Sequence, residues 1–157
     1  MATTADGFLR RWRITRHMTL EYLDFVSDAV LDLRPTSAFR TMREQAVHLA
    51  ELQGVYQLAL RGEAVDYERA SEFSPASDRR EDIVAAMAER DREYLALVDE
   101  LLPKGPAHRL ESWYGITLEG FDSHHADHER LHQGQWIALT ALAGHPQPPE
   151  AARIWVL

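Results

Sequence analysis

Residues 118–142 read LEGFDSHHADHERLHQGQWIALTAL, and this stretch decides the class of fold. Positions three or four residues apart form one stripe along it, which is typical of one face of an α-helix. The ends of the stripe are apolar, whereas its centre carries three imidazoles. The stripe consists of Leu118, Phe121, His125, His128, His132, Gln135, Leu139 and Leu142.

His128 and His132 lie four residues apart within this stripe. Side chains with that spacing stack on one face of a helix, so both rings can hold one metal ion. A buried polar group without a partner costs roughly 1–3 kcal/mol, which a shared ion would offset. Because the chain has no cysteine, it has no disulfide, no thiolate ligand and no cysteine nucleophile of its own.

Three further segments carry the same helical periodicity, at residues 7–33, 37–60 and 78–102. Residues 107–117 are less regular, and no segment has the alternation of a strand. We therefore expect an all-α fold, a four-helix bundle formed by a single domain over residues 1–157. The tail from Gln147 to Leu157 ends in four apolar residues, so it is expected to dock on the bundle or on a partner chain.

His48 lies in the middle of the apolar stripe of the second segment, and we predict that it is the third ligand. Three histidines with one open position are typical of catalytic zinc sites, although imidazole also suits nickel, iron and copper. Two neighbours, His124 and His125, are interpreted as residues around the ligands or facing substrate, or else as ordinary solvated or hydrogen-bonded histidines. Gln135 or His125 could orient water or substrate.

The sequence from His128 to His132 also spells the H-E-x-x-H motif of zinc proteases, in which the glutamate activates water. After His132 the chain offers only His145 as a further ligand, beyond the helix-ending Gly144. The sequence also predicts no edge strand that would bind a peptide. A bundle therefore argues against a protease.

The formal net charge of −8 and the pI near 5.4 disfavour contact with nucleic acid. The short basic stretch of residues 10–13, followed by Arg16, is interpreted as a solvated helix face. No apolar run is long enough to cross a bilayer, and residues 1–7 lack the pattern of a signal peptide. We expect a soluble, cytoplasmic protein without nucleic-acid or membrane partners.

The chain resembles the DinB-like (DinB/YfiT) superfamily of metal-binding four-helix bundles. The resemblance rests on the long first helix, on Leu33-Arg34-Pro35 leading to residues 43–49, and on the late His128-x-x-x-His132-Gln133-Gly134-Gln135 motif. It implies a divalent ion, commonly zinc or nickel, on His48, His128 and His132. The family's frequent His-Arg-Gly-Gln has Gln133 in place of arginine here, which we expect to remove a basic residue beside the site.

Characterised members of this superfamily include transferases and isomerases that use mycothiol, bacillithiol or glutathione. The resemblance therefore suggests a metal-dependent S-transferase with a low-molecular-weight thiol cosubstrate, acting in detoxification or stress response. One alternative is a non-catalytic, metal-binding stress protein, a homodimer in which the apolar tail builds the interface. A metal-dependent hydrolase that needs no thiol is the other.

Overall fold

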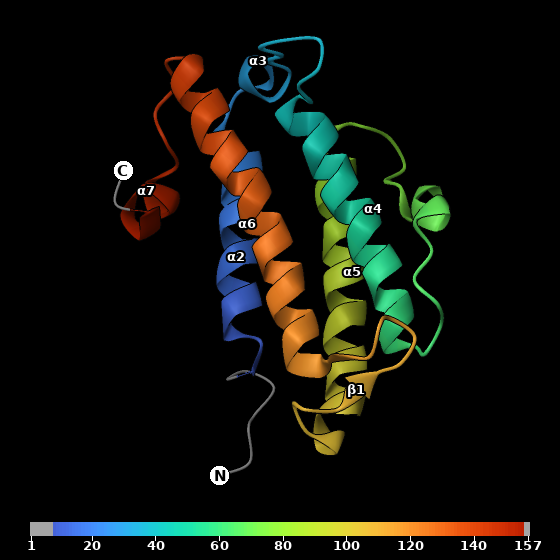
Figure 1. Cartoon of the computed structure of the whole chain (residues 1–157). Coiled ribbons are helices and arrows are strands. Elements are labelled where there is room, and N and C mark those ends of the chain that lie inside the picture. The colour runs from blue at the N-terminus through green and yellow to red at the C-terminus, as the bar shows by residue number, and fades with distance from the viewer. Residues whose placement is uncertain (1–7, 156–157) are drawn as a thin grey trace.

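Four long helices form the body of the protein in the computed structural model, which describes residues 8–155 (Figure 1). They are α2 (Arg10–Phe25), α4 (Met42–Leu60), α5 (Arg80–Leu101) and α6 (Leu118–Leu142). Helix α2 packs against α6 and α4 packs against α5, and α4 also meets α6. The predicted all-α, four-helix bundle is thus confirmed.

The linker between α4 and α5 crosses back along the outside of α4. It contains the 3₁₀ helix η1 (Tyr67–Phe73), which packs against Gly54, and the Ser74 hydroxyl then donates to Glu51 nearer the start of α4. Helix α5 consequently begins at the same end of the bundle as α4, and the two run parallel (Figure 1). With α5 and η1 on its other sides, α4 turns its remaining face toward α6.

Two predicted helix boundaries are wrong. The first helix is interrupted at Ser27, where the backbone is extended, so that α2 is followed by the short α3 (Asp28–Leu31); the predicted start at Gly7 lies outside the described residues. The second helix begins at Met42 instead of Ser37. Thr41 caps it, because its side chain accepts from the backbone N–H of Glu44 and its own N–H donates to the Glu44 carboxylate.

The connection before α6 contains a minimal hairpin, in the segment that the sequence indicated only as less regular and either extended or a loop. After the 3₁₀ helix η2 (Leu102–Lys104), strand β1 (Arg109–Leu110) pairs antiparallel with β2 (Ile116–Thr117). The hairpin leads directly into α6, whose first turn is capped by the Thr117 hydroxyl accepting from the N–H of Gly120. The predicted bounds of this helix are confirmed.

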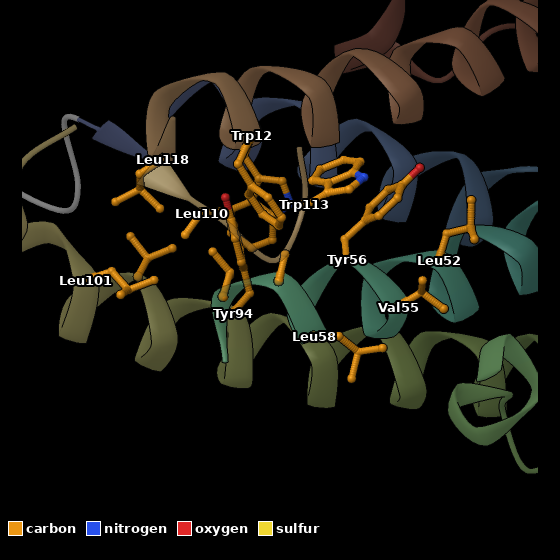
Figure 2. Packing of buried hydrophobic residues seen from close by; sticks show 14 of the residues in the cluster. Trp12, Leu52, Val55, Tyr56, Leu58, Tyr94, Leu101, Leu110, Trp113 and Leu118 are labelled. Atoms are coloured by element: carbon orange, nitrogen blue, oxygen red, sulfur yellow. The ribbon is translucent and has the colours of Figure 1, made fainter. Parts of the chain in front are cut away.

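Aromatic side chains dominate the core at the hairpin end of the bundle (Figure 2). Trp12, Tyr94 and Trp113 are buried there among leucines from α4, α5, α6 and the hairpin. The predicted stripe of α6 lies inward at Leu118, but Leu142, its last member, is exposed.

The C-terminal tail forms α7 (Pro149–Trp155), which docks on α2 as expected. The carboxylate of Glu21 accepts from the backbone N–H groups of Glu150 and Ala151, and so caps the start of α7. Ala151 is buried in the contact. The last two residues of the predicted tail lie outside the described part. Among residues 8–155, no helix is long and apolar enough to span a membrane.

Candidate metal centre

Three imidazoles meet in the seam between α4 and α6. His48 extends from α4, and His128 and His132 extend from successive turns of α6. One nitrogen from each ring lies within 4.8 Å of the nitrogens of the other two. The ring centres of His128 and His132 are 4.9 Å apart, and that of His48 lies 5.6 Å and 5.4 Å from them. The three residues selected from the sequence are therefore neighbours.

Gln45, one turn before His48 on α4, fixes how His132 presents its ring. The side-chain oxygen of Gln45 lies 3.0 Å from the indole nitrogen of Trp136, and an indole nitrogen can only donate. The same oxygen lies 2.9 Å from Nδ1 of His132 and can only accept. Nδ1 therefore carries the hydrogen, and the lone pair of His132 is on Nε2. An imidazole held in this way resembles a metal ligand that is oriented by a second hydrogen bond.

Burial favours the neutral form of all three rings. It lowers the pKa of His128 and of His132 to about 4, and the neighbouring imidazoles add to the effect. Burial also lowers the pKa of His48, helped by the positive charge of Arg40. Near neutral pH each ring thus has a free lone pair, which is the form that binds a metal ion.

The residues present fit a divalent transition-metal ion. Zinc–nitrogen bonds measure about 2.0–2.1 Å, so nitrogens that share an ion lie within about 4 Å of one another, close to the spacing here. His48 and His128 are half-buried, whereas His132 is buried. Next to His48, a cavity of about 460 Å³ opens between α4 and the loop before it.

The comparisons with known proteins agree with this geometry. A model of the DinB superfamily matches residues 11–136. The chain belongs to the DinB superfamily. No curated protein and no solved structure matches it. The match extends from the first turn of α2 to residue 136 of α6, so it includes all three histidines of the cluster.

The other three residues that the sequence suggested for the site, His124, His125 and Gln135, lie outside the cluster of His48, His128 and His132 in this DinB-superfamily chain. His125 is enclosed by the rings of Trp12, Tyr56, Tyr94 and Phe121, and its Nδ1 has no hydrogen-bond partner within residues 8–155. His124 is exposed and lies with its edge against Tyr56 and Trp113. Gln135 is half-buried, one turn after His132. Of the three, His124 is the one that an incoming molecule would meet most easily.

Glu129, the glutamate of the H-E-x-x-H motif, faces away from the three histidines. Its carboxylate accepts from the Thr19 hydroxyl and pairs with Arg16 at 3.2 Å, both of which belong to α2. The side chain is 1% exposed, so no water or peptide reaches it from the His128 side. This geometry supports the conclusion from sequence that the motif does not indicate a protease.

Arg16 is buried, which corrects its interpretation as part of a solvated face; Arg10, Arg11 and Arg13 are exposed as expected. Besides Glu129, Arg16 pairs with Asp91 at 3.3 Å and donates to Gln53 at 2.7 Å. Burial raises the pKa of both carboxyl groups, and the guanidinium opposes this shift. The network joins α2, α4, α5 and α6 behind the metal centre.

Gln133 also faces α2, where its amide donates to the backbone carbonyl of Thr15 at 2.7 Å and to the Thr19 hydroxyl at 2.9 Å. The expectation that this position lies beside the metal centre is therefore wrong. Gln133 therefore belongs to the core between α6 and α2, on a different side of α6 from His128 and His132.

Proposed function

We propose that the protein binds one zinc or nickel ion at His48, His128 and His132 and acts as a thiol-dependent S-transferase. The observation that carries this proposal is the convergence of three neutral imidazoles, one of which, His48, borders a cavity of about 460 Å³. Three protein ligands leave a coordination position open, as in catalytic sites. The cavity gives a small molecule room to approach that position.

The chain has no cysteine, so the sulfur of such a reaction has to arrive with a cosubstrate. When bound, a divalent ion supplies positive charge that favours the thiolate over the thiol near neutral pH. The thiol gives up its proton to solvent, its sulfur forms a bond to an electrophilic carbon of the acceptor, and the leaving group departs with the bonding pair. The protein's own part is to hold the three rings in place and, through Gln45, to keep Nε2 of His132 available.

Elemental analysis of the purified protein tests the metal site. We expect about one equivalent of zinc or nickel in the wild type and a large loss in His48→Ala and His132→Ala, since catalytic sites of this kind need all three ligands. His124→Ala is the matched control, because His124 lies on the same helix outside the cluster, and it should keep its metal. Equal metal contents in all four proteins would contradict the proposed ligands.

The chemistry is tested by following the consumption of a chlorodinitrobenzene acceptor with glutathione, bacillithiol or mycothiol. Turnover should require both a thiol and the metal, and a chelator should abolish it while circular dichroism still shows a folded bundle. Hydrolysis of an ester without any thiol would favour the hydrolase instead. A protein that unfolds when its metal is removed, and that turns over no thiol, would favour a structural ion.

We also propose that two copies associate through α7. Ile154 and Trp155 remain 38% exposed although the helix is docked on α2. An exposed apolar pair of this kind favours contact with another apolar surface. Sedimentation of the wild type and of Trp155→Ser measures whether a dimer forms and whether it depends on this surface.

A further inference from the structure

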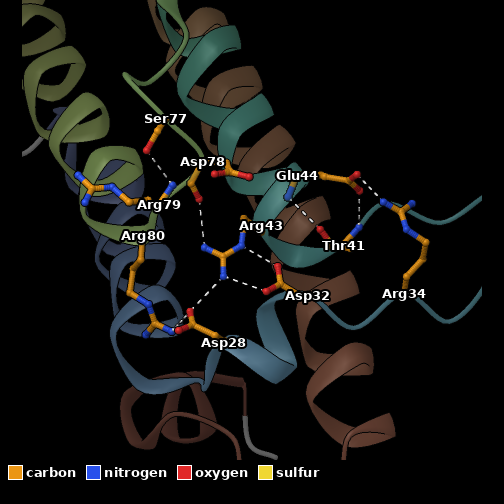
Figure 3. A network of polar contacts seen from close by, with 10 residues as sticks. All are labelled: Asp28, Asp32, Arg34, Thr41, Arg43, Glu44, Ser77, Asp78, Arg79 and Arg80. Atoms are coloured by element: carbon orange, nitrogen blue, oxygen red, sulfur yellow. Dashed lines mark hydrogen bonds and ion pairs between the residues drawn. The ribbon is translucent and has the colours of Figure 1, made fainter.

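The cavity beside His48 is bordered by three arginines, Arg34, Arg40 and Arg43. Figure 3 shows that two of them, Arg34 and Arg43, are bound to carboxylates. Arg34 pairs with Glu44, and Arg43 pairs with Asp32 at 2.6 Å and with Asp28 at 3.1 Å. These pairs tie the loop before α4 to the helix and shape the wall of the cavity. Neither guanidinium is free to serve as the main binding group for a ligand.

Arg40, the third arginine, forms no hydrogen bond and no ion pair through its side chain with any residue between 8 and 155. Its backbone, in contrast, is fixed. The carbonyl oxygen of Arg40 accepts from the side-chain amide of Gln45 at 3.0 Å, and the same amide holds His132. One glutamine therefore positions both a metal-ligand candidate and the residue that carries the unpaired cation.

Three acidic residues also line the cavity, namely Glu44, Glu51 and Asp78. Glu44 is bound by Arg34 and by the backbone N–H of Thr41, and Glu51 accepts from the Ser74 hydroxyl. Glu51 lies one turn after His48 along α4, whereas Arg40 precedes the helix. A ligand that reaches the three histidines through this cavity thus meets an unpaired positive charge on one side of His48 and a carboxylate on the other.

We propose that Arg40 binds a carboxylate of the cosubstrate, so that the cavity selects thiols that carry a carboxyl group on the Arg40 side of the sulfur. That the ligand is a thiol rests on the proposed function, whereas carboxylate binding by Arg40 does not. A guanidinium binds a carboxylate through two parallel hydrogen bonds, which gives orientation as well as affinity. The bound carboxylate would direct the sulfur toward the histidines.

Binding of 3-mercaptopropionate and of 3-mercaptopropionamide to the metal-loaded protein tests this inference. The two probes have nearly the same shape and differ in charge, so their ratio isolates the carboxylate. In the wild type we expect the acid to bind roughly tenfold more tightly than the amide, as for one charge-assisted contact. The ratio should fall toward one in Arg40→Gln and should shrink in high salt, because the contact is solvent-accessible.

Arg92→Gln is the matched control, since Arg92 is an exposed arginine on α5 that does not border the cavity. It should keep the wild-type ratio, and Arg40→Gln should keep its metal content. Succinate and succinamide, titrated into the metal-free protein, repeat the comparison without sulfur. Thiols that do not bind, together with an Arg40-dependent preference for succinate, would refute the proposed function and support the carboxylate site. Absence of any preference for the acid, or a preference that persists in Arg40→Gln, overturns the inference.

Discussion

Replacing Gln45 by leucine should weaken metal binding without touching any of the three histidines. Gln45 is 1% exposed, and its oxygen accepts from both His132 and Trp136. Leucine has a similar size but no acceptor. His132 would then be free to rotate and to move its hydrogen to Nε2, which would remove the lone pair that faces the other two rings.

The size of the effect follows from the contacts that are lost. Removing a hydrogen-bond partner behind a metal-binding histidine typically costs about 10- to 100-fold in metal affinity. The fold should also lose stability, because the N–H groups of His132 and Trp136 are left without an acceptor in a buried place. At roughly 1–3 kcal/mol for each of these two groups, we expect the free energy of unfolding to fall by about 2–6 kcal/mol in the metal-free protein.

Competition with a chelating indicator measures the zinc affinity, and urea unfolding with and without metal measures the stability. Gln57→Leu is the control, because Gln57 is equally buried on α4 but donates to the backbone carbonyl of Arg90 on α5. It should lose stability and keep its zinc affinity. Nitrogen chemical shifts of the histidine rings report directly whether Nδ1 of His132 carries the hydrogen.

Gln45→Glu separates orientation from simple disruption. A carboxylate still accepts from both His132 and Trp136, and a charged acceptor increases the basicity of the imidazole. We therefore expect this variant to bind zinc at least as well as the wild type does. Zinc affinity of Gln45→Leu within twofold of the wild type, or an equal loss in Gln57→Leu, would refute the proposed role of Gln45.

Two further predictions concern stability. Gly54→Ala places a methyl group against the ring of Phe73, so overpacking should lower the free energy of unfolding by about 1–3 kcal/mol. Gly134→Ala, on the open side of α6, should raise it by about 0.5–1 kcal/mol. Equal urea midpoints for the two variants would contradict the packing of η1 on α4. Burial raises the pKa of Asp122, which accepts from Tyr94, from 3.8 to about 6. Since the folded state binds this proton more tightly than the unfolded state, the contribution to stability is largest below pH 3.8 and is lost as the pH rises through 6. Between pH 4 and 7, the free energy of unfolding of the wild type should fall by about 2 kcal/mol more than that of Asp122→Asn. Identical changes with pH in the two proteins would disprove this prediction.

The fold could be predicted from the sequence because hydrophobic periodicity records which side of a helix is buried. The bounds of α6 followed from its stripe, and those of α5 were correct to within two residues. The interruption at Ser27 was missed because the apolar spacing continues through it: Val26 and Val30 are both buried although the backbone is extended at Ser27. Periodicity reports burial, and burial alone does not guarantee an unbroken helix.

The cluster of His48, His128 and His132 could be predicted because three histidines on two apolar stripes are costly to bury unless they share a partner such as a metal ion. The residues around them could not, because their roles depend on contacts between helices. Gln45 was only a polar residue on the predicted stripe of α4. Its role depends on hydrogen bonds with both His132 and Trp136 on α6, which the sequence of α4 does not indicate. Arg40 carried no signal at all, since an arginine in a loop is ordinary until a cavity is found beside it.

Helix α6 shows why spacing alone does not identify a metalloprotease. One face of the helix carries His128 and His132 toward α4, and a different face carries Glu129 and Gln133 toward α2. A glutamate one residue after a histidine is rotated by about 100° around a helix, so a neighbouring helix decides what it meets. Here Arg16 occupies that side and holds the carboxylate in the core. The glutamate therefore helps to anchor the back of the helix whose front presents the imidazoles, and any base for the proposed chemistry has to come from the cavity or from solvent.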